Sequence, residues 1–320
     1  MKMRIGVLTS GGDAPGMNAS IRAIVRTAIF NKIEVYGINR GYAGLLEGDI
    51  TPLNVYSVAD ILQRGGTILR TSRSEFFATD AGVKQSANVL SEYGIDHLIV
   101  IGGDGSMNGA LALQKLGVSV VGVPGTIDND LGFTDYTIGF DTAVTTALDA
   151  ISKIRDTTYS HNRINVVQVM GRKCGDIALY SGLSGGAEAL ILPEVETDLD
   201  AICLRLLQGK DRGKLHSIVM LAEGCGNYLD YCAKIEEKTQ VTTKGTNLGY
   251  IQRGGSPSNM DRNLASFMGY NAVLNIVKKE TGTVMAQRCG SYLGIPIEEA
   301  LQMPKIFRQD IYDMASVLSI

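Results

Sequence analysis

The sequence predicts an α/β protein built from two doubly wound, mostly parallel sheets. Short apolar runs, typical of buried strands, alternate with longer segments of helical periodicity along the 320-residue chain. The runs end on glycine, Asp, Thr, Arg or Glu, the residues expected where strand ends meet ligands. Glycine is in excess, with 38 residues against a usual frequency of ~7 %. Repeated strand–loop–helix units of this kind place helices on both faces of a sheet.

The first half of the chain shows this alternation from its start. Ile21, Ile24 and Val25 recur at helical spacing, and Ser57 and Asp60 suit the N-cap and first turn of a short helix. The expected strands are Ile5–Leu8, Val35–Ile38, Leu98–Ile101 and Ser119–Val123, and the expected helices are Met17–Phe30, Ser57–Gln63 and a segment from Ser106 to about Leu116.

The second half repeats the same order of strand, loop and helix. The expected strands are Asn165–Met170, Ala189–Leu192, Ser217–Ala222, Thr246–Ile251 and Thr283–Gln287, and the expected helices are Asp141–Thr157, Gly175–Ser184, Leu199–Gln208, Asp230–Lys238 and Asp261–Lys279. Thr283–Gln287 is expected to close the regular part of the chain. No linker rich in Gly, Ser or Pro marks a domain boundary.

Composition excludes several classes of function. With 30 Lys and Arg against 33 Asp and Glu, the net charge of −3 disfavours a nucleic-acid partner. The three histidines have no zinc-ligand spacing, and no apolar run is long enough for a membrane span or a signal peptide. The cysteines are odd in number and include no CxxC pair, so we expect reduced thiols in a cytoplasmic protein. They are Cys174, Cys203, Cys225, Cys232 and Cys289.

Two glycine-rich segments follow expected strands and precede expected helices. Gly11–Asn18 and Gly102–Ser106 would let backbone N–H groups approach a phosphate, and the helix that follows each segment favours anions. Asp104, inside the second segment, suits Mg²⁺ beside a polyphosphate. The alternative is an ordinary strand–helix turn, which needs fewer glycines. We therefore expect the surplus glycines, Gly109 and Gly185 among them, to lie in or beside ligand loops.

Paired carboxylates and loop arginines complete the candidate chemistry. Asp128 and Asp130 follow a strand, so one could act as a base toward a hydroxyl while the other orients it or meets a metal. Acidic turns are common, and only the strand-end position favours chemistry here. Arginines in loops could contact phosphate; these are Arg73, Arg163, Arg172 and Arg253. A looser basic group, which a solvated helix face explains best from spacing alone, comprises Arg22, Arg26, Arg155, Arg212, Lys214 and His216.

Together these segments resemble the bacterial ATP-dependent 6-phosphofructokinase family. The matching segments are LTSGGDAPGMN from Leu8, IGGDGS from Ile101, PGTIDND from Pro124, VMGRKCGD from Val169, AEG from Ala222 and IQRGGSP from Ile251. The resemblance covers essentially the whole chain and the combination is specific, although GGDG alone also occurs in lipid and NAD kinases. It implies the phosphofructokinase fold, with an ATP-binding domain over residues 1–138 and 252–305 and a sugar-phosphate domain over 139–251 and 306–320.

The resemblance implies transfer of the ATP γ-phosphoryl group to the 1-hydroxyl of fructose 6-phosphate in glycolysis, by a cytoplasmic, Mg²⁺-dependent homotetramer. Asp128 would be the base, Asp104 would hold Mg²⁺, and Thr126 and Arg172 would stabilise the transferring group. The implied ATP site comprises Gly12, Tyr42, Arg73, Gly103, Asp104, Gly105 and Ser106. The implied sugar-phosphate site comprises Asp130, Arg163, Met170, Gly171, Glu223, Lys244, Tyr250 and Arg253, with Arg163 and position 244 supplied by a neighbouring subunit. Glycine at positions 105 and 125 is typical of family members that use ATP rather than pyrophosphate.

The loose basic group then resembles the family's effector site for ADP, GDP or phosphoenolpyruvate, with Glu188 serving the effector's Mg²⁺. Its members would be Arg22, Arg26, Arg155, Gly186, Glu188, Arg212, Lys214 and His216. Three positions depart from the family pattern: Lys244 replaces Arg, Tyr250 replaces His and Val55 replaces Arg. Lys keeps a charge but loses the bidentate fork. The loss of a phosphate contact at Val55 predicts weakened or absent allostery.

Two other functions stay open at the level of sequence. The departures at Lys244, Tyr250 and Val55 would suit a non-catalytic paralogue that binds nucleotide or sugar phosphate. The changes on the sugar-phosphate side would also suit a kinase for a related substrate such as tagatose 6-phosphate.

Overall fold

The computed structural model describes residues 2–319, which divide into two compact units. Unit 1 comprises residues 2–127, 131–141 and 253–305, and unit 2 comprises residues 128–130, 142–252 and 306–319. The chain first passes from unit 1 to unit 2 between Ile127 and Asp128, in the loop after β5 (Ser119–Pro124), and returns to unit 1 at Leu131. Each unit has its own sheet, so each is described by itself.

Unit 1 is a seven-stranded sheet with the strand order β11-β10-β5-β4-β1-β2-β3. Its strands are β1 (Arg4–Thr9), β2 (Glu34–Ile38), β3 (Ile50–Leu53), β4 (His97–Gly102), β5 (Ser119–Pro124), β10 (Thr283–Arg288) and β11 (Ser291–Pro296). The five inner strands are parallel, whereas the edge strands β3 and β11 run antiparallel to their neighbours. Its helices are α1 (Met17–Phe30), α2 (Gly41–Glu47), α3 (Asp80–Glu92), α4 (Asp104–Lys115), α9 (Asn259–Val277) and α10 (Ile297–Ala300), with a 3₁₀ turn at Phe76–Ala78.

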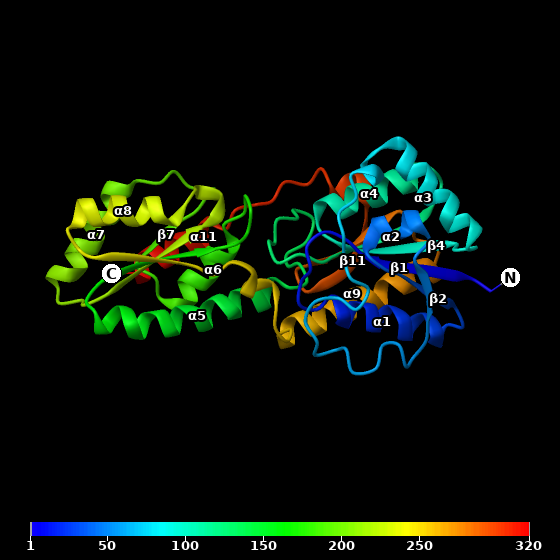
Figure 1. The fold of residues 1–320 in the computed structure, drawn as a ribbon, viewed down its shortest axis with the longest axis horizontal. Coiled ribbons are helices and arrows are strands. Elements are labelled where there is room, and N and C mark those ends of the chain that lie inside the picture. Colours follow the sequence, from blue (N-terminus) through cyan, green and yellow to red (C-terminus); the bar gives the residue numbers. More distant parts are fainter. Residues whose placement is uncertain (1, 320) are drawn as a thin grey trace. The chain divides into compact units, whose positions relative to one another are not determined.

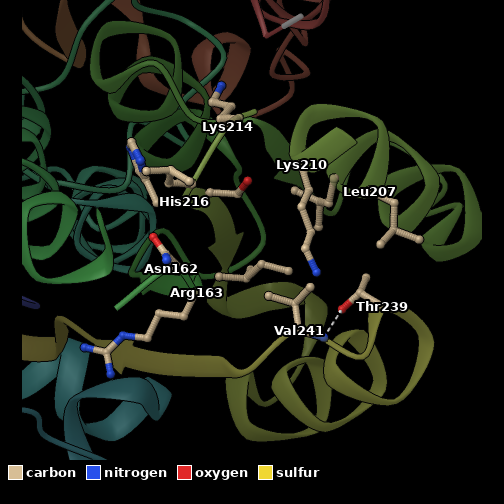
Figure 2. A pocket seen from close by; sticks show the side chains of 12 residues that line it. Asn162, Arg163, Leu207, Lys210, Lys214, His216, Thr239 and Val241 are labelled. Atoms are coloured by element: carbon tan, nitrogen blue, oxygen red, sulfur yellow. Dashed lines mark hydrogen bonds between the residues drawn. The ribbon is translucent and has the colours of Figure 1, made fainter. Parts of the chain in front are cut away.

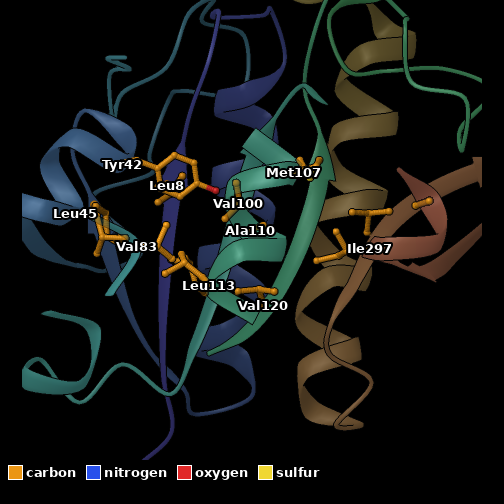
Figure 3. Close-up of a cluster of buried hydrophobic side chains, with 14 of the residues drawn as sticks. Leu8, Tyr42, Leu45, Val83, Val100, Met107, Ala110, Leu113, Val120 and Ile297 are labelled. Atoms are coloured by element: carbon orange, nitrogen blue, oxygen red, sulfur yellow. The ribbon is translucent and has the colours of Figure 1, made fainter. Parts of the chain in front are cut away.

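The helices of unit 1 cover both faces of its sheet. In Figure 1, α1 and α9 lie on one face, while α2, α3 and α4 lie on the other. The apolar side chains of β1, β4 and β5 fill the layer beneath α4, where Leu8, Val100 and Val120 meet Met107 and Leu113 (Figure 3). These strand residues and Met107 and Leu113 are fully shielded from solvent. Burial on both faces explains why the strands read as continuous apolar runs in the sequence.

Unit 2 is a four-stranded parallel sheet with the order β7-β8-β6-β9. The strands are β6 (Ile164–Val169), β7 (Ala189–Ile191), β8 (Ser217–Ala222) and β9 (Thr243–Asn247). The helices are α5 (Phe140–Ser160), α6 (Asp176–Gly185), α7 (Leu199–Asp211), α8 (Tyr228–Thr239) and α11 (Gln309–Leu318), with 3₁₀ turns at Glu223–Cys225 and Gly249–Arg253. In Figure 1, α7 and α8 cover one face of this sheet and α5 lies on the other. The prediction of two mostly parallel, doubly wound sheets is confirmed.

Three expectations for individual elements are wrong. The predicted helix Ser57–Gln63 is a series of turns, because the Asn54 side chain accepts from the amides of Tyr56 and Ser57 and Asp60 takes the left-handed conformation (φ 52°).

The predicted strand Thr246–Ile251 is displaced. Strand β9 ends at Asn247, whose side chain accepts from the Gly249 amide at 2.9 Å, and a 3₁₀ turn follows. The regular structure also does not close at Gln287. A tight turn at Cys289 and Gly290, both at positive φ, leads into β11, and α10 and α11 follow.

The surplus of glycine does not lie in ligand loops alone. A β-carbon on Gly109 would lie 2.8 Å from the Tyr42 and Phe77 rings, and one on Gly185 would contact Ile151. Gly109 therefore serves helix packing inside α4, and the prediction that it lies in or beside a ligand loop is wrong. Gly185 packs against α5 and directly precedes Gly186 of the predicted effector group. All five cysteines are free, and burial raises the pKa of Cys225 to about 11. Among residues 2–319, no helix has the length and apolar character needed to cross a membrane.

Candidate active site

Three glycine-containing loops lie side by side at one edge of the sheet in unit 1. They follow β1, β4 and β5, which are neighbours in the sheet and parallel, so their carboxyl ends meet at the same edge. The connection from β1 runs through α1 to β2 on one side, and the connection from β4 runs through α4 to β5 on the other. The loops after β1 and β4 therefore flank a topological switch point, the position at which doubly wound sheets bind ligands.

The loops touch one another through bare backbone. The Ser10 amide donates to the carbonyl of Ile101 at 2.9 Å, and the Gly125 amide donates to the carbonyl of Gly102 at 2.9 Å. A β-carbon on Gly102 would lie 2.5 Å from the Ser10 carbonyl oxygen and 2.4 Å from Oγ of Ser106. Only glycine can occupy position 102, because the neighbouring loop leaves no space for a side chain.

Helix α4 begins directly on the second glycine loop. Gly103 is its N-cap, and Asp104, Gly105 and Ser106 form its first turn. The first turn of a helix has backbone N–H groups without intrahelical partners and carries partial positive charge. Asp104 and Gly105 are exposed, and a β-carbon on Gly105 would have nothing within 4 Å. This turn can therefore receive a phosphate from solvent.

The chemistry of Asp104 fits a magnesium ion that arrives with a nucleotide. Asp104 is exposed, and the one contact that its carboxylate makes within residues 2–319 is with the Asn108 side-chain amide, at 3.3 Å. Mg²⁺ at nucleotide sites takes one or two carboxylates together with phosphate oxygens and water. Across the described residues, no group of three or more His, Cys, Asp or Glu side chains gathers to hold an ion on its own.

Tyr42 lies in the core beneath this turn. Its side chain is 5 % exposed, stacks on Phe77 with ring centroids 3.8 Å apart, and donates to the carbonyl of Ser106 at 2.7 Å. The structure thus places Tyr42 as a support for the first turn of α4, in contrast to the expectation that it lines the nucleotide site. Ser106 is buried as well, and its Oγ points toward the first glycine loop, 3.4 Å from a β-carbon built on Gly11.

Two of the loop arginines belong to this edge of unit 1. A β-carbon built on Gly12 would lie 3.4 Å from Cζ of Arg253, so this guanidinium lies against the first glycine loop. Arg73 is exposed and follows Thr71, whose hydroxyl donates to the Gly11 carbonyl at 2.7 Å. Arg253 was expected at the sugar-phosphate side, and within unit 1 it lies beside the loop expected to hold the nucleotide.

Asp128 and Arg172 meet in unit 2. The Asp128 side chain is buried, and its Oδ2 lies 3.4 Å from Nε of Arg172, whose side chain is 56 % exposed. Arg172 takes a left-handed backbone conformation (φ 54°), and Gly171 before it has φ 130°. These two residues form a sharp turn just after β6, and the turn brings the Arg172 side chain to the buried Asp128 carboxylate.

A buried polar pair holds the loop that carries Asp128 and Asp130. Asn129 lies between them at φ 52°, and its amide donates to Oδ2 of Asp176 at 2.8 Å. Asn129 and Asp176 are 1 % and 2 % exposed. Asp176 is the first residue of α6, where a negative charge is favourable. The pair therefore fixes the loop conformation that sets the direction of both flanking carboxylates.

Substitution of Asp176 tests this role. We expect Asp176→Ala to lower the unfolding free energy by about 1.5–3 kcal/mol, the contribution of a hydrogen bond to a charged group. In an assay of the activity that the resemblance implies, we also expect kcat to fall about tenfold or more with little change in the KM for ATP, because a displacement of about 1 Å at a reacting group can cost 10²-fold in rate.

The matched control for Asp176 is Asp198→Ala. Asp198 caps α7, where its Oδ1 accepts from the Ala201 amide at 2.9 Å. Its loss is expected to cost about 1 kcal/mol of stability and to leave kcat unchanged. Steady-state kinetics and urea unfolding are measured for both variants. If Asp176→Ala had the same kcat as the unsubstituted protein, Asp176 would not position the loop that carries Asp128 and Asp130.

The predicted sugar-phosphate residues divide between the two ends of the sheet in unit 2. At the carboxyl end, Oε1 of Glu223 accepts from the Arg172 amide at 2.8 Å, and the Met170 amide donates to Gln252 at 3.2 Å. Tyr250, 79 % exposed, follows the carboxyl end of β9. Arg163 and Lys244 lie at the opposite end, because Arg163 immediately precedes β6 and Lys244 pairs in register with Asn165. A six-residue strand spans about 20 Å, so Arg163 and Arg172 cannot meet within one chain.

The basic group expected to bind an effector is also divided. Arg22 and Arg26 lie on α1 in unit 1, with Val55 in the same unit. The rest of the group gathers in unit 2 around Glu188, which is 4 % exposed. The contacts in unit 2 are Lys214 Nζ to Glu188 Oε1 at 2.6 Å, Arg155 Nη1 to His216 Nε2 at 3.1 Å, and Arg155 Nη2 to the Gly186 carbonyl at 3.0 Å. Arg212 is exposed at the end of α7.

Glu188 is occupied by protein partners. Besides Lys214, its Oε2 accepts from the Ile218 amide, and Arg155 Nη1 lies 3.9 Å from its Oε1. These contacts tie the loop after α6 to the start of β8. The carboxylate expected to meet an effector-bound Mg²⁺ thus also holds two cations of the predicted effector group in place.

His216 makes this cluster sensitive to pH. Burial, followed by the charge of Arg155, lowers the pKa of His216 below its ordinary value. The unfolded chain therefore binds a proton at a higher pH than the folded chain, so the contribution of His216 to stability is present above pH ~6.5 and is lost as the pH falls. We expect urea unfolding midpoints to decrease from pH 7.5 to pH 5.5, and His216→Gln, which keeps an acceptor for Arg155, to reduce that decrease.

Part of the pH dependence should survive in His216→Gln, because burial also lowers the pKa of His97. His161→Gln is the control, since His161 is an exposed residue near the end of α5. If the urea unfolding midpoint fell by the same amount between pH 7.5 and pH 5.5 in His216→Gln and in the unsubstituted protein, His216 would not be the source of the pH dependence.

Sequence reasoning missed the residues that hold the loops. Asn18 is 1 % exposed, donates to the carbonyls of Arg64 and Gly65, and accepts from the Ile68 amide at 2.7 Å. Gln252, fully buried, links the 3₁₀ turn to Met170. Asn18 and Asn129 lie within the glycine-rich and acidic motifs, so their position was a usable signal, but their bonding partners are remote in sequence.

Comparison with known proteins places the chain among phosphofructokinases. The family model described as phosphofructokinase matches residues 4–276. The protein named ATP-dependent 6-phosphofructokinase of Clostridium botulinum (strain Hall) is 55 % identical over 315 residues, which cover 98 % of this chain and 99 % of that protein. The protein of the same name from Alkaliphilus metalliredigens is 56 % identical over 316 residues, which cover 99 % of each chain.

Solved structures agree with the family match. A phosphofructokinase of Saccharomyces cerevisiae superposes with a TM-score of 0.89 and 33 % identity over 100 % of this chain and 48 % of the yeast chain. This chain thus spans about half the length of its yeast relative. A pyrophosphate-dependent phosphofructokinase of Marinobacter aquaeolei gives a TM-score of 0.84 over 99 % of this chain and 91 % of that one, and at 22 % identity this likeness concerns the fold.

Proposed function

Because the chain belongs to the phosphofructokinase family, we propose that it transfers the γ-phosphoryl group of ATP to the 1-hydroxyl of fructose 6-phosphate. Relatives that are 55–56 % identical over nearly their whole length carry the name ATP-dependent 6-phosphofructokinase, which favours ATP as donor and this sugar phosphate as acceptor. The products are fructose 1,6-bisphosphate and ADP, a step of glycolysis. Five free cysteines suit a protein of the reducing cytoplasm.

One observation carries the assignment of the site. Asp128, a buried carboxylate paired with Arg172, follows two residues after Thr126. Thr126 itself lies in the third loop of the unit 1 edge, where a β-carbon on Gly103 would be 3.5 Å from its Cβ. The chain thus joins a phosphate-binding edge to a candidate base within two residues.

In this proposal Asp128 accepts the proton of the sugar 1-hydroxyl as its oxygen attacks the γ-phosphorus. Arg172 and Thr126 stabilise the negative charge on the transferring phosphoryl oxygens. The glycine loops and the first turn of α4 bind and orient the donor phosphates. Asp104 would hold Mg²⁺, which neutralises charge on the phosphates when bound. Asp130, Met170, Gly171 and Glu223 orient the sugar.

We assign nucleotide binding to unit 1 and sugar-phosphate binding to unit 2. Unit 1 holds the glycine loops, whereas unit 2 holds Asp128, Asp130, Arg172 and Glu223. The separation of Arg163 and Lys244 from Arg172 supports a homo-oligomer in which a second copy supplies the cations for the sugar 6-phosphate. A homotetramer would provide such shared sites.

A substrate panel tests the proposed activity. The full chain is assayed with Mg²⁺, with ATP or pyrophosphate as donor, and with fructose 6-phosphate or tagatose 6-phosphate as acceptor. The proposal expects the highest kcat/KM with ATP and fructose 6-phosphate. A higher value with tagatose 6-phosphate would assign the related kinase, and the same trace activity in the unsubstituted protein and in Asp128→Ala would assign a non-catalytic paralogue.

Effector control is proposed to be weak. Val55 carries no charge where the family usually places a phosphate ligand, and Glu188 is engaged by Lys214 and Arg155. Titration of the activity with ADP and with phosphoenolpyruvate should change the curve for fructose 6-phosphate little. A strongly sigmoidal response to either ligand would contradict this part of the proposal.

A further inference from the structure

Unit 2 contains a cavity of 280 Å³ at the amino-terminal end of its sheet, the end opposite Gly171 and Glu223. Its lining includes the first residues of two strands, Ile164 of β6 and Ser217 of β8. Helix α7 contributes a third side of the lining through Lys210 and two leucines. The volume is close to the lower limit of small-molecule sites, ~300 Å³.

The cavity opens on the face of the sheet that α7 and α8 cover. Ile164 and Leu206 belong to the core between the sheet and these helices, together with Val219 of β8. Side chains alternate along a strand, so Ser217 shares the face of Val219, while His216 turns to the opposite face, toward Arg155 of α5. The cavity therefore differs from the basic cluster around Glu188, although Lys214 and His216 form part of its rim.

The walls of the cavity are mainly apolar. The side chains that form them are Ile164, Leu206, Leu207, Leu215 and Val241. Leu215 is 47 % exposed, so an apolar surface stays in contact with water at the entrance. A ligand with a short hydrocarbon chain would remove this surface from water, which is favourable in proportion to the area buried.

Two polar groups at the cavity have no protein partner. Ser217 is 7 % exposed, and its hydroxyl makes no hydrogen bond within residues 2–319. Lys210 makes no ion pair with any carboxylate in the same part of the chain. Figure 2 shows Lys210 extending from α7 toward Thr239 and Val241, while the guanidinium of Arg163 points away from it. The Ser217 hydroxyl stays in contact with solvent and Lys210 is exposed, so both can bind a ligand oxygen in place of water.

We propose that this cavity binds a small amphipathic monocarboxylate. Lys210 and Ser217 supply one positive charge and one hydroxyl donor for the two oxygens of a carboxylate, and the leucine, isoleucine and valine side chains receive its hydrocarbon chain. The cavity contains none of the proposed catalytic residues, although Arg163, proposed to meet the sugar 6-phosphate in a second copy, lies at its edge. The proposal does not depend on the proposed kinase activity.

Isothermal titration of the full chain with hexanoate tests the proposal. Hexan-1-ol and hexylammonium have the same hydrocarbon chain with a neutral and a positive head, so we expect weaker binding of the alcohol and none of the ammonium. Removal of the charged partner in Lys210→Met should weaken hexanoate binding about 10- to 100-fold, and Ser217→Ala about two- to tenfold. Each methylene group removed should weaken binding about fourfold, so butanoate, which is two methylene groups shorter than hexanoate, should bind about 16-fold more weakly.

Lys234→Met is the matched control. Lys234 is an exposed lysine on α8 near Tyr231 and does not line the cavity, so its loss should leave hexanoate binding unchanged. The proposal is overturned if millimolar hexanoate does not bind, if hexan-1-ol binds as tightly, or if Lys210→Met binds hexanoate like the unsubstituted protein. Equal weakening by Lys234→Met would also overturn it, because the effect would then reflect net charge.

Discussion

Asp128→Asn is expected to lower kcat for phosphoryl transfer by about 10²- to 10⁴-fold, the usual contribution of a positioned general base. Asparagine has the shape of aspartate and can still accept from Arg172, but its amide cannot take a proton from the sugar hydroxyl. The side chain is buried, and its ion-pair partner Arg172 is largely exposed, so solvent can hydrate the charge left on Arg172. We therefore expect the KM for ATP and the unfolding free energy to change little.

Steady-state kinetics with a coupled assay, together with urea unfolding, checks this result. The matched control is Asp149→Asn, which removes an exposed carboxylate on α5 that pairs with Lys153. Exposed pairs contribute about 0–1 kcal/mol, so kcat should not change in this control. A fall in kcat of less than tenfold in Asp128→Asn would remove Asp128 from the role of base.

Gly105→Asp is expected to lower kcat/KM for ATP by about 10²-fold or more through charge alone. A side chain at position 105 meets no atom within 4 Å and projects from the first turn of α4. A carboxylate there would face the donor phosphates, and two like charges 4 Å apart repel by about 4 kcal/mol at an effective dielectric constant of 20. The fold should not suffer, because an acidic residue near a helix N-terminus stabilises the helix by about 0.3–1 kcal/mol.

Gly105→Ala distinguishes the effect of a negative charge at position 105 from the effect of filling the open space there. Alanine fills the same position without a charge, so kcat/KM for ATP should fall much less than in Gly105→Asp. The ratio of activity with pyrophosphate to activity with ATP, measured with fructose 6-phosphate as acceptor, should rise in the Asp variant. Equal losses in the Ala and Asp variants would show that open space, and not charge, matters at this position.

The inner strands could be predicted because they are buried on both faces, whereas the exposed edge strands β3 and β11 were not predicted. The predicted strands Ile5–Leu8, Leu98–Ile101 and Ser217–Ala222 match β1, β4 and β8 within one residue at each end. Helix Met17–Phe30 matches α1 at both ends. The failures occur where side chains redirect the backbone locally. Asn54 and Asn247 each form a turn in which the side-chain oxygen replaces a backbone acceptor. The pattern of apolar and polar residues does not predict such a turn.

In the candidate site as well, the sequence predicted some features and could not predict others. The motifs alone pointed to Gly12, Asp104, Asp128 and Arg172, because bare backbone, carboxylates and arginines at strand ends have few structural reasons to occur together. The partners that fix them came only from the tertiary structure. Asp176 lies 47 residues from Asn129, and the Asn18 side chain reaches a loop 46 to 50 residues away. The spatial neighbours of a side chain depend on strand order, which a single sequence does not encode locally.

By itself, the sequence determined the class of fold, the family and the residue types at each strand end. These properties depend on periodicity and on local motifs, which short segments carry on their own. Only the tertiary structure decided which end of a sheet each residue occupies, and it separated Arg163 and Lys244 from Arg172 and Glu223. It also revealed the cavity beside Lys210 and Ser217. The physical reason is that burial acts on each segment separately, whereas a site and its partners form only when segments remote in sequence pack together.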